Sequence, residues 1–156
     1  MRRRSMTTVA AALALAGLGL SAGTAGAAPA AVVPADLAPQ AGWGTSYYAW
    51  NDPEDSGGVS VAEQAYKTTS DEYVHGRFRA YGEVLSIWDY HDNDRRSVVK
   101  LWVGGSGPAV FYSKGDNSYR EVNLSYDEGQ TVHIQTCTSD TSGAVCTEKS
   151  RVPGVS

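Results

Sequence analysis

The sequence predicts an all-β protein, a small antiparallel β-sandwich with one hairpin disulfide. Short runs of alternating polar and apolar residues recur at roughly ten-residue spacing, with Gly, Asn and Asp clusters between them, which is typical of sandwiches. No helical periodicity of useful length follows residue 27. The only two cysteines, Cys137 and Cys146, lie close enough in sequence to pair across a hairpin.

Residues 1–27 have the features of a secretory signal peptide. A charged start, Arg2-Arg3-Arg4, precedes an apolar run over residues 9–20 and then small residues. Cleavage is expected after Ala27, because the competing site at residues 28–30 holds a proline. The apolar run is shorter than the ~20 residues that span a bilayer. We therefore expect a secreted, extracellular protein that does not insert into a membrane.

Removal of this segment makes the chain more acidic. The whole chain has 13 basic and 17 acidic residues, and residues 1–27 contribute three arginines and no carboxylate. The remaining residues include 10 basic and 17 acidic side chains, which give a formal charge of −7. Such a chain is repelled by phosphate backbones and anionic lipid. Nucleic acid and membranes are thus poor partners, and a protein or a sugar is expected instead.

Residues 28–41 predict an extended N-terminal arm, because Ala, Pro and Val dominate and no apolar pattern is present. The β-sandwich domain is expected over residues 42–156. It opens with four aromatic residues that are predicted to bind a partner: Trp43, Tyr47, Tyr48 and Trp50. In strand alternation Tyr48 and Trp50 share one face and Tyr47 points to the other. The alternative is that these residues form the core of the first strand.

A polar turn over residues 51–58 is followed by a strand over residues 59–69. Residues 77–81 and 84–88 form strand segments interrupted by Gly82, which is interpreted as a bulge. Residues 89–96 are a charged turn. Further strands are expected at residues 97–103, 109–112, 121–125 and 131–136, and around Val145 and Cys146.

The predicted disulfide closes a loop of about ten residues, which stabilises the fold by roughly 2–3 kcal/mol. Cys137 shares alternation with His133 and Gln135, whereas Val132 and Ile134 occupy the opposite face. The disulfide is therefore expected to clamp the outer face or an edge of the sandwich, and not its core.

No pattern in the chain predicts catalysis, a metal or a cofactor. Residues 54–58 resemble the nucleophile motif of chymotrypsin-like proteases, but no histidine precedes Ser56, and a polar turn is expected. Residues 89–94 resemble a calcium loop, but Arg95 and Arg96 compete for its carboxylates. The three histidines are dispersed: His75, His91 and His133.

Three segments resemble a group of small secreted actinobacterial proteins that are single-disulfide β-sandwiches. These are residues 82–85, the turn at 92–96 leading into 97–99, and residues 127–133 leading to Cys137 and its partner Cys146. More loosely, an Ala/Pro arm before an aromatic-rich start resembles the adaptor subunit of actinobacterial umbrella toxin particles. This resemblance implies an N-terminal segment that docks on a lectin subunit and links it to a toxin subunit.

The sequence thus predicts a secreted, non-enzymatic protein-interaction module, with an adaptor role in an extracellular toxin complex implied by the resemblance. Two alternatives remain open. A protease inhibitor would present the Cys137–Cys146 hairpin as a rigid exposed loop. A carbohydrate-binding module would present a coplanar pair of exposed aromatic rings.

Overall fold

The computed structural model describes residues 40–156. The predicted signal peptide at residues 1–27 lies outside these residues, as does the predicted arm at 28–41 except for Gln40 and Ala41. The described part contains no helix with the length and apolar character needed to traverse a bilayer. The strands are β1 (Trp43–Asn51), β2 (Val59–Lys67), β3 (Tyr73–Arg79), β4 (Val84–Asp89), β5 (Val98–Val103), β6 (Ser106–Tyr112), β7 (Ser118–Asn123), β8 (Thr131–Cys137) and β9 (Gly154–Val155).

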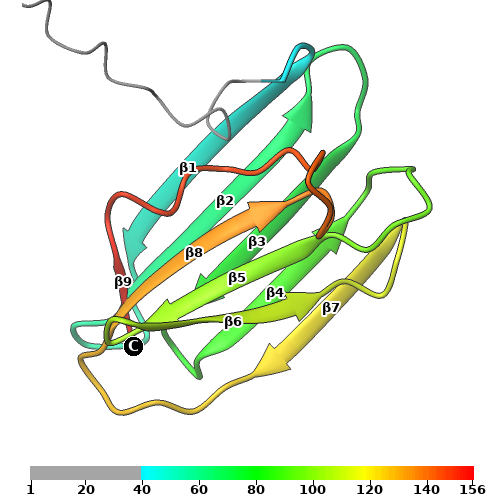
Figure 1. Ribbon diagram of the computed structural model, residues 1–156. Coiled ribbons are helices and arrows are strands. Elements are labelled where there is room, and N and C mark those ends of the chain that lie inside the picture. The colour runs from blue at the N-terminus through cyan, green and yellow to red at the C-terminus, as the bar shows by residue number, and fades with distance from the viewer. Residues whose placement is uncertain (1–39) are drawn as a thin grey trace, which may run out of the picture. The chain divides into compact units, whose positions relative to one another are not determined.

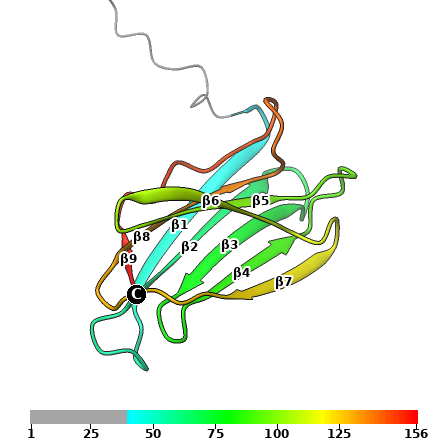
Figure 2. The same cartoon turned by 60° about the horizontal axis from the view of Figure 1, so that its bottom comes forward.

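All of these strands belong to one antiparallel sheet that curls over on itself (Figures 1 and 2). The strand order is β6-β5-β8-β9-β2-β3-β4-β7, and β1 pairs with the remaining edge of β2. The fold-over occurs at β9, where Val155 pairs with both Val59 and Thr131. We call β1, β2, β3, β4 and β7 the five-stranded layer, and β5, β6 and β8 the three-stranded layer.

The core lies between the two layers, because alternate residues of each strand point inward. The principal buried cluster draws on both layers and comprises Val61, Phe78, Ala80, Leu85, Ile87, Val99, Leu101, Val132 and Ile134. Gly76 allows the layers to approach, since a Cβ there would lie 2.4 Å from Oγ1 of Thr136. The all-β prediction is confirmed, and the two layers of the predicted sandwich are parts of one curled sheet.

The predicted bulge at Gly82 is wrong. The Glu83 amide donates to the Ala80 carbonyl (2.8 Å), and Gly82 and Glu83 have positive φ angles of 72° and 50°. Two successive left-handed residues reverse the chain, so β3 and β4 form a hairpin. Arg79 pairs directly with Val84 across this turn.

Other strand boundaries differ from the predicted ones at places where the alternation of polar and apolar residues is weak. β3 begins at Tyr73, before the expected residue 77, and β7 covers Ser118–Asn123 in place of residues 121–125. The last strand is β9, whereas Cys146 forms only an isolated bridge with Cys137. β9 has only two residues and forms because it pairs with β2 and β8. A strand this short shows no alternation of polar and apolar residues in the sequence.

The disulfide between Cys137 and Cys146 is present, with a Cα–Cα distance of 4.1 Å. Cys137 has the outward alternation expected from its neighbours, yet it is only 1% exposed, so the expectation of an outer clamp needs correction. The hairpin that it closes folds inward, because Val145 packs against Ala65 and Val74 of the five-stranded layer. The disulfide therefore fastens a hairpin that covers one end of the core.

Candidate functional site

The outer side of the five-stranded layer gathers most of the exposed aromatic side chains. In the described residues, five of the eight well-exposed large apolar side chains lie there, and Tyr48 is the most open at 61%. Alternation places the strand residues among them together, because each points to the side away from the core, and Tyr90 directly follows β4. We call this surface the aromatic face: Tyr48, Trp50, Tyr66, Tyr73, Trp88, Tyr90 and Tyr119.

Strand register brings the rings into contact around Trp88. One row of paired residues runs across three strands through His75, Trp88 and Tyr119. The Trp88 ring lies 4.8 Å from that of His75, edge to face, and 4.9 Å from that of Tyr119, tilted by 39°. Tyr73 and Tyr90 form a second pair at 5.0 Å. Such contacts hold the rings in fixed positions.

One cation stands at the centre of the aromatic face. The Arg77 guanidinium lies 5.0 Å from the Trp88 ring centroid, and its Nη2 donates to Oγ of Ser86 at 3.5 Å. Its Nε is buried and has no partner among the described residues. Arg77 thus places one positive charge among the rings of the aromatic face.

The two titratable rings packed on Trp88, His75 and Tyr119, stay uncharged at neutral pH. Burial, and then the charge of Arg77, lower the pKa of His75 to about 4. Burial and the adjacent Glu121, which accepts a hydrogen bond from the phenol, raise the pKa of Tyr119. The face therefore offers rings, hydroxyl groups, the Arg77 guanidinium and the Glu121 carboxylate, with no base positioned against a nucleophile.

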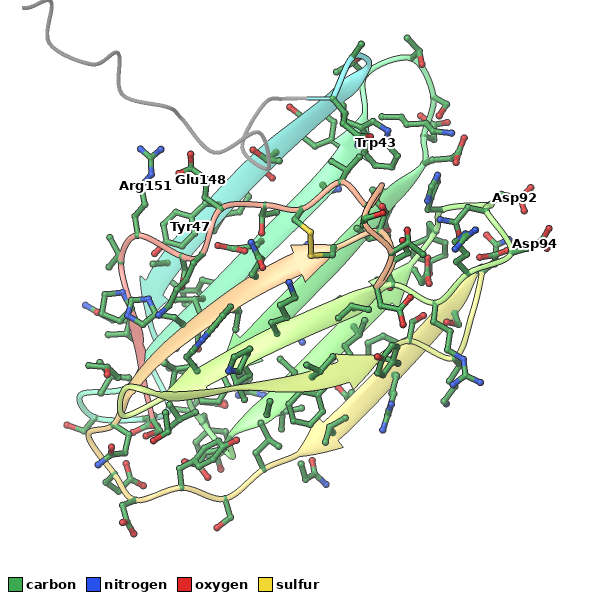
Figure 3. All side chains as sticks on the ribbon, in the orientation of Figure 1. Trp43, Tyr47, Asp92, Asp94, Glu148 and Arg151 are labelled. Carbon is green, nitrogen blue, oxygen red and sulfur yellow. A yellow bond between two sulfur atoms is a disulfide. The ribbon has the colours of Figure 1, made fainter. Side chains whose placement is uncertain are left out.

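The four predicted partner-binding residues divide into two pairs. Trp43 points inward against Val145 and meets the His91 ring edge to face at 4.9 Å. Tyr47 also points inward, and its hydroxyl donates to the carbonyl of Val152 at 2.8 Å (Figure 3). Tyr48 and Trp50 point outward and belong to the aromatic face. The core interpretation thus fits Trp43 and Tyr47, whereas Tyr48 and Trp50 remain exposed.

Sequence reasoning missed the rest of the aromatic face, although the signal was present. Tyr66 alternates with the buried Ala65, and Trp88 alternates with the buried Ile87. Extending the alternation from the core residues to their neighbours would have placed both rings on the outer side. Tyr119 required the pairing of β7 with β4, which only the tertiary structure supplies.

A groove of about 270 Å³ lies between β1 and residues 147–151, and sequence reasoning missed it too. At its base is Glu63, which is 2% exposed and accepts a hydrogen bond from the Thr147 hydroxyl. Burial raises the pKa of Glu63 to about 8. Glu148, Lys149 and Arg151 surround the opening of the groove, as Figure 3 shows for the first and last.

The motifs that sequence analysis set aside lie in loops between strands. Ser56 is exposed in the turn between β1 and β2. Asp92 and Asp94 project from the loop between β4 and β5 (Figure 3). Residues 40–156 bring together no group of three or more His, Cys, Asp or Glu side chains that could hold a metal ion.

Comparison of the chain with protein-family models, with curated proteins and with solved structures gives no match. The functional argument therefore rests on the geometry of this chain.

Proposed function

We propose that this protein is a secreted, non-enzymatic module that binds a protein partner through the aromatic face. The observation that carries the proposal is the set of exposed Tyr and Trp rings on one face, among which Trp88 packs on Tyr119 and Tyr73 packs on Tyr90. Tyr, Trp and Arg are the residues that contribute most to protein–protein binding energy. Rings already fixed by their neighbours lose little conformational entropy when a partner covers them.

A sugar fits this face less well than a protein. The contacting ring pairs are tilted by 39° and 47°, and the Arg77 guanidinium already lies over Trp88. A pyranose ring stacks best on a flat, open aromatic platform. The inhibitor alternative would use only the tip of the disulfide hairpin, because Thr138 and Ser139 are buried and residues 140–143 are exposed.

Secretion is part of the proposal. A hairpin disulfide is typical of proteins from oxidising compartments, and residues 1–27 have the pattern of a signal peptide. We extend the proposal to an adaptor of an extracellular toxin complex, in which the arm at residues 28–41 and the aromatic face would contact different subunits. The resemblance at the start of the chain supports this extension.

The proposal is tested by recovering partners from culture medium with three forms of the protein as bait. The double variant Tyr48→Ser/Trp50→Ser alters the aromatic face. The control Val110→Ser alters an equally exposed apolar residue outside it. We expect the native protein and the control to recover the same partner, and the double variant to recover at least tenfold less.

Equal recovery by all three baits would contradict the proposal. If no protein is recovered, and the protein binds a glycan array in a way that Trp50→Ala abolishes, the ligand of the aromatic face is a sugar and not a protein.

A further inference from the structure

Three strands of the curled sheet have an open edge within residues 40–156: β1, β6 and β7. β6 contains Pro108 and loses register opposite Leu101. Arg120 and Glu121 occupy β7, and Arg120 donates to the Tyr112 carbonyl of β6 at 2.7 Å. Proline, irregular register and charge all discourage a further strand from pairing.

β1 has none of these protections. Its nine residues contain no charged side chain and no proline, and they pair with β2 in unbroken register from Trp43 to Asn51. A long, uncharged and regular edge is a template for another strand. The half-exposed Val152 stands beside it, since the Tyr47 hydroxyl reaches the Val152 carbonyl.

The hydrogen-bond pattern shows which backbone groups face the open edge. Just beyond the two ends of β1, the Asp52 amide donates to Gly58, and the Gly42 carbonyl accepts from Thr68. Antiparallel pairs alternate between bonded and non-bonded, so the even-numbered residues of β1 face β2. The amides and carbonyls of its odd-numbered residues, Thr45, Tyr47 and Ala49 among them, therefore face outward.

We infer that β1 pairs antiparallel with β1 of a second copy of this chain, about a two-fold axis at Tyr47. This register uses the whole strand and sets Tyr47 opposite the partner's Tyr47, and Thr45 opposite the partner's Ala49. Its hydrogen-bonded pairs join odd-numbered residues whose polar groups face the edge, and they alternate with non-bonded pairs of even-numbered residues, as an antiparallel ladder requires. A two-fold axis is the usual symmetry of homodimers.

The outer side chains of β1 complement each other in this register. Along the strand they are Gly44, Ser46, Tyr48 and Trp50. The two-fold axis sets Trp50 opposite the partner's Gly44 and Tyr48 opposite the partner's Ser46, large against small. Gly44 is covered by the Tyr66 ring, which lies 2.6 Å from where a Cβ would be. Trp50 would therefore pack on the partner's Tyr66, and both rings are 37% exposed in the single chain.

A second copy also suits the charge of the edge. The chain is acidic overall, with a formal charge of −4, so most of its surface repels a copy of itself. β1 carries no charge that would face its own image at the axis. The dimer is independent of the proposed function, but it would join two aromatic faces into one continuous surface.

Two double variants of the intact protein test the pairing and its register by analytical ultracentrifugation. Thr45 and Ala49 are exposed, so their substitution leaves the single chain folded. Thr45→Lys/Ala49→Lys sets like charges opposite each other twice across the axis, whereas Thr45→Glu/Ala49→Lys sets opposite charges there. We expect the native protein and the Glu/Lys variant to sediment as dimers, and the Lys/Lys variant to dissociate at least tenfold more readily.

A native protein that stays monomeric at all loading concentrations would overturn the inference. So would a Lys/Lys variant that remains as dimeric as the Glu/Lys variant, because the interface would then lie elsewhere. Circular dichroism of each variant checks the fold. The proposed function is measured separately, since the monomeric Lys/Lys variant retains the rings of the aromatic face and should still bind the partner.

Discussion

The outer sides of the two layers follow the same alternation of inward and outward residues. They differ in whether another segment of the chain bonds to their side chains. On the three-stranded layer, polar side chains bond to residues 147–150, which run along the edge of β8 and extend Lys149 across the outer side of the layer. Gln135 donates to the Thr147 carbonyl at 2.8 Å, and Nδ1 of His133 lies 2.7 Å from the Ser150 carbonyl oxygen. Lys149 lies 4.8 Å from the Trp102 ring centroid. On the five-stranded layer, no described segment crosses the aromatic face in this way.

Because of this difference, we expect the outer side of the three-stranded layer to contribute to stability and the aromatic face to contribute to binding. Side chains that bond to the chain's own backbone contribute to folding and leave little free for a partner. Rings that pack only on each other remain open on their other side. We therefore expect substitutions on the three-stranded layer to change the free energy of unfolding, and substitutions on the aromatic face to change affinity.

The largest effect is expected from the disulfide of the three-stranded layer. Cys137→Ser/Cys146→Ser frees a short hairpin loop and should lower the free energy of unfolding by about 2–3 kcal/mol. Denaturant unfolding measures this loss. Partner affinity at a temperature where the variant is folded should stay within twofold of native. A tenfold loss of affinity in the folded variant would place the hairpin in the binding surface.

The opposite pattern is expected for Trp50→Ala. Truncating an interface tryptophan costs about 2 kcal/mol of binding free energy, or roughly thirtyfold in Kd. Interferometry with the recovered partner measures it. The matched control Val110→Ala, altering a residue 45% exposed on β6, should change Kd less than twofold. Equal effects of the two substitutions would remove the distinction between the layers.

The pH dependence of stability should divide between the core and the aromatic face. Glu63 has a folded pKa of about 8 against 4.5, so ionising it opposes folding and stability falls as pH rises through this window. His75 has a folded pKa of about 4 against 6.5, so stability is lost as pH falls through that window. Above pH 6.5 the effect of His75 on stability no longer changes with pH. Of these two groups, only Glu63 then makes the free energy of unfolding depend on pH.

Between pH 6.5 and 8 the native protein should lose up to about 1.4 kcal/mol of unfolding free energy per pH unit. Glu63→Gln keeps an oxygen for the Thr147 hydroxyl and should remove this slope. Thermal unfolding across the pH range measures it, with the exposed Glu128→Gln as control. A slope that persists in Glu63→Gln would assign it to another group.

The smallest effect is expected from Lys149→Ala, which removes the cation over Trp102. An exposed contact of this kind contributes about 0.5–1 kcal/mol to stability. Chemical denaturation should detect the loss, whereas Lys114→Ala, an exposed lysine on a turn, should leave the midpoint unchanged. Identical midpoints for both variants would mean that the contact contributes nothing.

Strand alternation predicted much of the fold and less of the site. Val99 and Leu101 mark β5 clearly, because these two buried residues alternate with the half-buried Lys100 and Trp102. The start of β3 could not be predicted because of Gly76. The close approach of the layers requires a glycine there, and a glycine interrupts the alternation of apolar residues. Glu63 occupies an inward position where alternation predicts an apolar residue. Its burial follows from tertiary packing beside Thr147, distant in sequence.

Oxidative footprinting of the protein alone and with its partner tests the central claim most directly. Tyr90 and Tyr119 lie on the aromatic face away from β1, so dimer formation at that edge leaves them open. Tyr112 and Trp102 belong to the three-stranded layer and serve as internal references. We predict that the partner protects Tyr90 and Tyr119 and leaves the reference pair reactive. Protection of Tyr112 and Trp102, with Tyr90 and Tyr119 unchanged, would contradict the proposal.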